Sequence, residues 1–135
     1  MVKQVIAPRI RGFISLTAHP DGCAANVRRQ VAIAKSGSSD EAQLGHALVI
    51  GSSTGYGLAS LLSACFGYDA ETIGVCLERP SEEDKAGSAG WYNLAEAHRL
   101  AAAEGRKLQT VNVDAFSREA KEEVAEALRA SSGRV

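Results

Sequence analysis

The sequence lacks an excess of charge of either sign. Its 135 residues carry 15 Lys and Arg against 16 Asp and Glu, so the formal net charge is −1. Surfaces that bind nucleic acid or anionic membranes carry a clear basic excess. The composition therefore predicts a protein that binds neither, and its 45% of apolar residues is typical of a globular domain.

Long apolar runs and paired cysteines are also missing. No run approaches the roughly 20 apolar residues that span a bilayer. The longest clean run, residues 12–18, is too short for the apolar part of a signal peptide. Cys23, Cys65 and Cys76 are an odd number at wide spacings, without a Cys-x-x-Cys pair. This pattern predicts free thiols in a cytoplasmic protein, with neither a disulfide framework nor a metal site.

Strand-like and helix-like segments alternate along the chain. Residues 1–45 predict an N-terminal strand–turn–helix segment, with a strand over 12–18, a turn over 19–22 and a helix over about 24–35. The turn separates His19 from Cys23, so that pair is not expected to share a helix face or to bind a metal.

Residues 46–135 predict three rounds of strand and helix. The expected strands are 47–50, which we expect to be buried, 72–77 and 108–113. The first helix is expected to end at Gly67 and the second at Gly105, and the third to begin at Ser117. We expect Gly67 to be left-handed, and His98 to be a packed core histidine. Such alternation is typical of an α/β fold, a Rossmann-type parallel sheet with covering helices. Since a doubly wound fold normally continues with further strands, we expect only the N-terminal half of a dinucleotide-binding domain here.

A glycine-rich stretch, LVIGSSTGYGLAS at residues 48–60, follows the first of these strands. Glycines between a strand and a helix are typical of a nucleotide fingerprint. Gly51 suits the tight turn, Gly55 the close approach of a pyrophosphate, and Gly57 close packing of helix on sheet. Backbone N–H groups and the helix dipole would face the anion. Further hydroxyl donors would come from Ser52, Ser53 and Thr54.

The glycines allow two other interpretations. Leu58 and Ala59 stand where a P-loop needs Lys and Ser or Thr, which disfavours a P-loop NTPase. A glycine-rich turn that serves sheet geometry alone remains the structural alternative.

Two carboxylates follow the next two predicted strands. Glu78, 21 residues after Gly57, suits hydrogen bonds from the adenosine ribose hydroxyls and would repel the 2′-phosphate of NADP. Arg79 beside it could instead receive that phosphate. Between the carboxylate and the arginine we favour the carboxylate, and the expected cofactor is therefore NAD(H). Asp114, followed by Ala115, could reach the adenine amino group. The alternatives are a solvated loop carboxylate at Glu78 and helix capping at Asp114.

Five stretches, in this order, resemble the N-terminal part of a known family: IRGFISLTAHPDGCAANVRRQ, IGSSTGYGLAS, LERP, SAGWYN and DAFS. The family is the trans-2-enoyl-CoA reductases, including FabV-type enoyl-acyl-carrier-protein reductases, relatives of the short-chain dehydrogenase/reductases. The resemblance implies NADH-dependent reduction of the trans-2 double bond of an enoyl thioester on acyl carrier protein or CoA, in fatty acid synthesis. Hydride goes to C3, and the enolate that forms on the thioester oxygen is then protonated. The implied cofactor positions are Gly51, Ser52, Ser53, Thr54, Gly55, Tyr56, Leu77, Glu78, Asp114 and Ala115.

The family's catalytic pair, a Tyr followed nine positions later by Lys, has no counterpart in the sequence. Nine residues after its three tyrosines stand Cys65, Leu77 and Ala101. The shorter Tyr-x-x-x-Lys spacing fails as well, since it reaches Ser60, Thr72 and Glu96. We therefore expect no catalytic residue here and no reductase activity of these residues alone. Two other function classes stay open, a non-catalytic nucleotide-binding or docking module and an S-adenosylmethionine-dependent methyltransferase.

Overall fold

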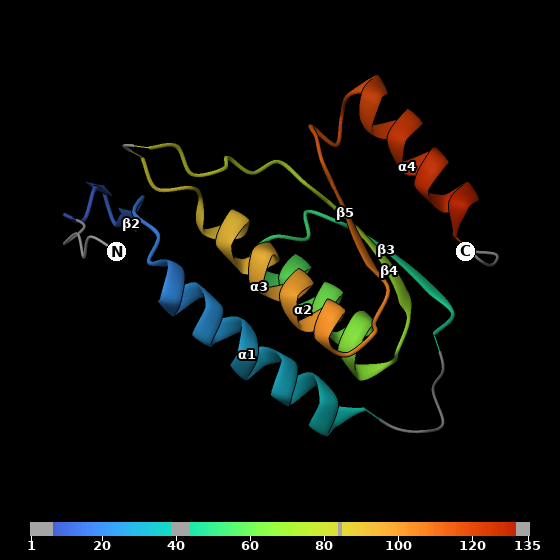
Figure 1. Ribbon diagram of the computed structural model, residues 1–135. Helices are drawn as coiled ribbons and strands as arrows, with labels where there is room; N and C mark the ends of the chain where they lie inside the picture. Colours follow the sequence, from blue (N-terminus) through green and yellow to red (C-terminus); the bar gives the residue numbers. More distant parts are fainter. Residues whose placement is uncertain (1–6, 39–43, 84, 132–135) are drawn as a thin grey trace.

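The computed structural model describes residues 7–38, 44–83 and 85–131. Its centre is a parallel sheet of three strands in the order β3-β4-β5. Helices α2 and α3 cover one face of this sheet, with α1 packed against them on the side away from the strands, and α4 covers the other face (Figure 1). The predicted Rossmann-type class is therefore confirmed. The elements are β1 (Ile10–Arg11), β2 (Ile14–Ser15), α1 (Pro20–Gly37), β3 (His46–Ile50), α2 (Gly55–Leu62), the π-helical turn η1 (Ser63–Gly67), β4 (Glu71–Cys76), α3 (Ala89–Ala103), β5 (Leu108–Asn112) and α4 (Arg118–Ala130).

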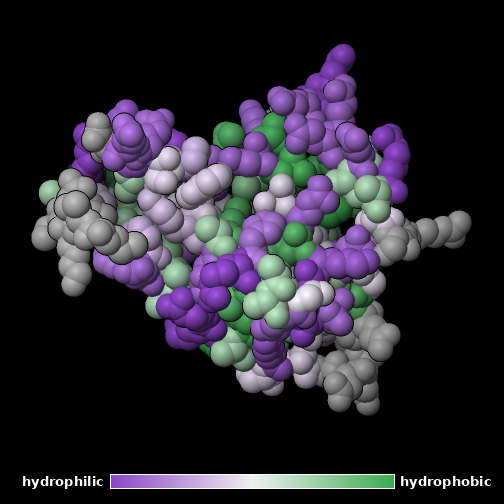
Figure 2. Space-filling view, in the orientation of Figure 1, coloured by the Kyte–Doolittle hydropathy of each residue, from purple (hydrophilic) through white to green (hydrophobic). Residues whose placement is uncertain are grey.

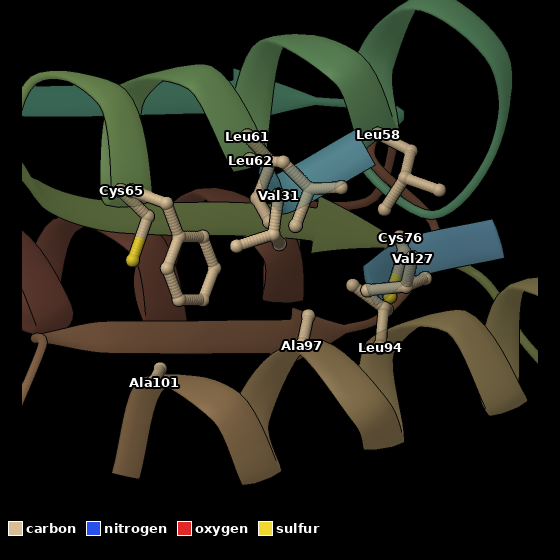
Figure 3. Packing of buried hydrophobic residues seen from close by; sticks show 11 residues of the cluster. Val27, Val31, Leu58, Leu61, Leu62, Cys65, Cys76, Leu94, Ala97 and Ala101 are labelled. Atoms are coloured by element: carbon tan, nitrogen blue, oxygen red, sulfur yellow. The ribbon is translucent and has the colours of Figure 1, made fainter. Parts of the chain in front are cut away.

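The central strand β4 supplies side chains to two separate apolar clusters. Val75 and Cys76 are consecutive in this strand, so their side chains point to opposite faces of the sheet. Cys76 belongs to the larger cluster, in which side chains from α1, η1, α2 and α3 meet (Figure 3). Val75 belongs to the smaller cluster beneath α4, with Val111, Val113 and Ala120. None of the helices in the described part of the chain combines the length and apolar character needed to cross a membrane.

Strand β3 is less buried than the sequence predicts. Within the described residues it is an edge strand, because only β4 is paired with it. The helix α4 packs over β4 and β5, and Leu48 and Ile50 remain 36% and 66% exposed. The prediction of a buried strand is therefore wrong for these two side chains, although the strand itself is confirmed.

The N-terminal segment departs from the prediction in two places. The expected strand over 12–18 is instead a short antiparallel hairpin in which Ile10 pairs with Ser15 and Arg11 with Ile14. Gly12 lies in the turn at a φ of 63°, a left-handed conformation that glycine adopts without strain.

The expected turn over 19–22 is in fact the first turn of α1. His19 is the N-cap, and its Nδ1 accepts a hydrogen bond from the N–H of Gly22 at 3.1 Å. Pro20 occupies the first helical position, where a missing N–H costs nothing. The backbone N–H of Cys23 donates to the carbonyl of His19 at 2.9 Å. His19 is thus a helix cap, and the described residues contain no cluster of metal-ligating side chains.

A buried carboxylate ties α1 to α3. Glu96, on α3, is 8% exposed and accepts a 2.8 Å hydrogen bond from Arg28 Nη1 of α1. Arg99, one turn along α3, donates two further bonds of 2.8 Å, one to each carboxylate oxygen of Glu96. The two bonds from Arg99, followed by the one from Arg28, lower the pKa of Glu96 to about 2 against its ordinary value of 4.5.

We expect this carboxylate to make stability depend on acid pH. Because the folded-state pKa is depressed, the contribution is complete above about pH 5 and is lost as the pH falls toward about 2. Both arginines are more than half exposed, so we discount the effect to about 1 kcal/mol. Urea unfolding at about pH 7 and about pH 3 should show wild type losing that much more stability than Glu96→Gln. Glu122→Gln, on the exposed side of α4, should behave as wild type, and equal losses in wild type and Glu96→Gln would contradict the assignment.

Candidate functional site

The loop between β3 and α2 is held tightly against the sheet. Gly51 turns the chain off β3 at a φ of 78°. Its N–H and that of Ser52 both donate to the carbonyl of Val75, at 2.8 and 3.0 Å. A Cβ on Gly57 would overlap the carbonyl oxygen of Gly51 and lie 2.7 Å from its carbonyl carbon. The predicted role of Gly51 in the turn is thus confirmed. Gly57 does permit close packing, but of α2 against the loop and not, as predicted, against the sheet.

The amino end of α2 opens outward from this loop. Its N-cap, Thr54, makes no side-chain capping bond, and the first turn holds no acidic residue. The first N–H groups of a helix have no partner within the helix, and together with the helix dipole they attract anions. A Cβ on Gly51 or Gly55 would meet no atom within 4 Å. The loop therefore leaves open space in front of a positive helix end, which fits a pyrophosphate.

The two serine hydroxyls of the loop face the protein, not that open space. Ser52 is fully buried, and its Oγ donates to the carbonyl of Val75 at 3.2 Å. Ser53 Oγ donates to Glu78 Oε1 at 2.5 Å. The expectation that both hydroxyls add donors toward an anion is wrong for this geometry. Backbone N–H groups and the hydroxyl of the exposed Thr54 remain the donors that the loop offers.

Glu78 lies beside the loop, between the carboxyl end of β4 and the start of α3. A Cβ on Gly90, in the first turn of α3, would overlap the Glu78 carboxylate and lie 2.7 Å from Ser53 Cβ. Asn93, one turn along α3, donates from Nδ2 to the carbonyl of Ser53 at 3.0 Å. The half-buried carboxylate of Glu78 is thus fixed next to the glycine loop and is not a freely solvated loop side chain.

Asp114 and Ala115 follow β5 at the same carboxyl edge of the sheet. Asp114 is exposed, and its Oδ1 accepts from the N–H of Phe116 at 3.0 Å. Its carbonyl accepts from the N–H of Ser117, which is the residue that caps α4. No hydrogen bond within residues 7–38, 44–83 and 85–131 joins Asp114 to Glu78 or to the loop. The adenine role of this pair stays a prediction.

Exposed apolar side chains lie at the carboxyl ends of all three strands. Ile50 ends β3, Leu77 follows β4 and Phe116 follows β5, with exposures of 66%, 70% and 96%. In Figure 2 apolar surface gathers between α4 and the start of α3, near these strand ends. Only Leu77 was a candidate from the sequence. Apolar surface suits an aromatic ring of a ligand, the glycine loop suits an anionic group, and the two carboxylates suit hydrogen-bond donors between them.

His98 lies behind Glu78 in a cavity of about 150 Å³ between α3 and β5, which Trp91 and Asn112 also line. It is half-buried, and its Nε2 lies 2.9 Å from Thr110 Oγ1. Burial lowers the pKa of its ring. The prediction of a packed core histidine is confirmed only in that the ring is tied to β5, since His98 lines a cavity and belongs to neither buried cluster. Sequence reasoning missed three other residues around Glu78, namely Gly90, Asn93 and Asn112, and the SAGWYN stretch was the only signal for the first two.

Comparison with known proteins places this site in a family. Residues 5–83 match the NAD(P)H binding domain of trans-2-enoyl-CoA reductase, and residues 85–135 match the trans-2-enoyl-CoA reductase catalytic region. The chain is 49% identical over 131 residues to the enoyl-[acyl-carrier-protein] reductase [NADH] of Shewanella oneidensis, and 48% identical to that of Variovorax paradoxus. It covers 33% of the length of each, so it spans about a third of these curated relatives.

Two solved structures share the fold. The trans-2-enoyl-CoA reductase of Treponema denticola in complex with NAD superimposes with a TM-score of 0.88 at 40% identity, over 93% of this chain and 33% of that one. The trans-2-enoyl-CoA reductase of Clostridium acetobutulicum in complex with NADH gives 0.86 at 29% identity, over 98% and 33%. The matched regions, the glycine loop and the parallel sheet lead to one conclusion: the chain belongs to the trans-2-enoyl-CoA reductase family and contains its NAD(P)H-binding domain.

Proposed function

We propose that this chain is the NADH-binding part of a reductase that acts on the trans-2 double bond of an enoyl thioester, carried on acyl carrier protein or CoA, in the cytoplasm. The observation that carries the proposal is the uncapped amino end of α2, facing open space, with the Glu78 carboxylate fixed beside it. The names of the relatives and the cofactors of the two solved structures support the same choice.

Each predicted site residue has a role in this proposal. The pyrophosphate lies against the loop from Gly51 to Gly55 and is held by the N–H groups that follow Ser52, because those of Gly51 and Ser52 donate to Val75. Tyr56, 95% exposed, flanks it. Glu78 accepts hydrogen bonds from the ribose hydroxyls and, being negative, opposes a 2′-phosphate. The adenine contacts come from Leu77, Asp114 and Ala115. Ser52 and Ser53 act by holding the loop and Glu78 in place. Thr54, whose side chain makes no capping bond, offers its hydroxyl to the anion.

The cofactor supplies hydride for C3 of the enoyl thioester when it is bound, and the chain's own residues bind and orient it. A reductase also needs a proton donor near the thioester oxygen and a cation that steadies the charge there. The Tyr and Lys spacing that provides these in the family is not found in the sequence. We therefore propose that these 135 residues bind NADH without completing the reduction.

Calorimetric titration of the chain with NADH, NADPH and S-adenosylmethionine tests the cofactor assignment. We expect NADH to bind about tenfold more tightly than NADPH, because a 2′-phosphate beside Glu78 costs about 1.4 kcal/mol or more. S-adenosylmethionine should give no binding heat. Binding of S-adenosylmethionine without NADH would favour a methyltransferase and overturn the proposal.

Incubation with crotonyl-CoA and NADH tests the second half of the proposal. We expect the NADH absorbance to remain constant, because the proton-donating Tyr and its Lys are missing. Consumption of NADH with formation of butyryl-CoA would show that other residues of this chain supply the proton. The enoyl reductase of Shewanella oneidensis serves as the positive control for the assay.

A further inference from the structure

The backbone of Glu78 is clamped by one side chain. Its N–H donates to Asn112 Oδ1 at 2.7 Å, and its carbonyl accepts from Asn112 Nδ2 at 2.9 Å. The amide of a single asparagine thus satisfies both backbone polar groups of the residue that is proposed to recognise the ribose.

The clamp lies just beyond the point where backbone hydrogen bonds between β4 and β5 end. Strands β4 and β5 pair up to Cys76 and Asn112, and the N–H of Val113 donates to the carbonyl of Cys76 at 2.7 Å. Beyond that point β5 turns away at Asp114, whose carbonyl accepts from Ser117. The Asn112 side chain therefore replaces the strand partner that Glu78 would otherwise have, and it holds β4 extended to the site.

The carboxylate end of Glu78 is fixed independently. Ser53 Oγ donates to Oε1, and the absence of a side chain at Gly90 makes the space in which the carboxylate lies. Backbone and side chain are thus held from opposite sides, by β5 on one and by the glycine loop and α3 on the other. Because the residue is held at both its backbone and its side chain, the distance between its carboxylate and a bound ribose stays fixed.

We propose that Asn112 is a positioning residue that sets the preference of this site for NADH over NADPH by fixing the Glu78 peptide. The inference rests on the proposed function, because it requires the ribose to lie at Glu78. If the backbone of Glu78 can shift, its carboxylate makes weaker hydrogen bonds with the ribose hydroxyls. It can also move away from a 2′-phosphate. Loss of the clamp therefore lowers affinity for NADH and raises relative affinity for NADPH.

The test compares affinities for NADH and NADPH in wild type, Asn112→Ala and Asn112→Val. The valine variant introduces a β-branched side chain that favours a strand, so it guards against a failure of β5 to form. We expect the ratio of NADH affinity to NADPH affinity to fall about tenfold in both variants. That is about the contribution of one hydrogen bond between a ribose hydroxyl and the charged carboxylate. Gln109→Ala, an exposed residue of the same strand, is the control and should leave the ratio unchanged.

A double-mutant cycle with Glu78→Gln separates positioning from a general structural role. In the Glu78→Gln background the Asn112 change should no longer alter the ratio, because the charge that it positions is gone. Equal weakening of both cofactors, with the ratio kept, would overturn the role of Asn112 while leaving the NADH assignment intact. A wild-type chain that binds neither cofactor would overturn the proposed function, and the inference with it.

Discussion

Replacing Gly57 by alanine should both destabilise the protein and abolish NADH binding. The new Cβ would overlap the carbonyl oxygen of Gly51 and approach Ser52 Cα to 3.3 Å. Both are backbone atoms, so no side chain can rotate away to relieve the overlap. Either the loop or α2 must move, and we expect a loss of about 3 kcal/mol in urea unfolding, the upper part of the range for overpacking. In the chain that stays folded the moved loop no longer presents its N–H groups to the pyrophosphate.

Gly55→Ala should separate these two effects. Gly55 has a φ of 54°, so alanine there costs about 1–2 kcal/mol, but its Cβ would meet no protein atom within 4 Å. That open space is where we place the pyrophosphate, and NADH affinity should therefore fall at least about tenfold, the cost of displacing one good contact. An affinity equal to wild type would show that the pyrophosphate does not lie against Gly55.

Gly105→Ala is the matched control for this strain. Gly105 follows α3 at a φ of 65°, and a Cβ there would also meet nothing within 4 Å. It completes the helix end, where the N–H of Arg106 donates to the carbonyl of Ala101 at 2.8 Å. We expect a similar loss of stability and an unchanged affinity for NADH, because the site lies at the opposite end of the sheet strands.

The elements of this fold were predictable because their signals are local. A glycine that must take a positive φ after a strand, as Gly51 does, and apolar residues recurring at helical spacing are visible within one short segment. Positions that depend on a neighbouring segment were not. Gly67 was expected to be left-handed, but Asp69 has the positive φ, of 53°. Gly67 instead makes room for α1, since a Cβ there would lie 3.0 Å from the carbonyl oxygen of Ala34.

The same distinction holds in the candidate site. Gly57, Glu78 and Asp114 could be proposed from their order and their places after strands. The direction of a hydroxyl could not, because Ser52 and Ser53 are adjacent yet donate to different partners, Val75 and Glu78. Nor could the clamp by Asn112, whose partner is 34 residues away in the chain. An amide at the end of an apolar strand is a common feature, and only the pairing of β4 with β5 gives it a partner.

Phe66→Ala should be the most destabilising truncation in the core. Phe66 is 2% exposed, in the π-helical turn that follows α2, and belongs to the large cluster shared by α1, α2 and α3. Removing a buried phenyl ring leaves a cavity and costs about 3–5 kcal/mol. Since domains of this size have only about 5–15 kcal/mol of stability, urea unfolding should show a variant close to its limit. Phe13→Ala, at a residue that is 98% exposed, should change stability by less than about 0.5 kcal/mol.

Addition of NADH then tells whether this core supports the site or only the fold. A ligand at 100 times its dissociation constant stabilises the folded state by about 2.7 kcal/mol, whatever the starting stability. If the loop and Glu78 keep their geometry in the Phe66→Ala variant, NADH should add that amount of stability, the same as we expect for wild type and for Phe13→Ala. Recovery of much less would mean that the packing of η1 against α1 also positions the amino end of α2. The cofactor site would then depend on the whole helical layer and not on the loop alone.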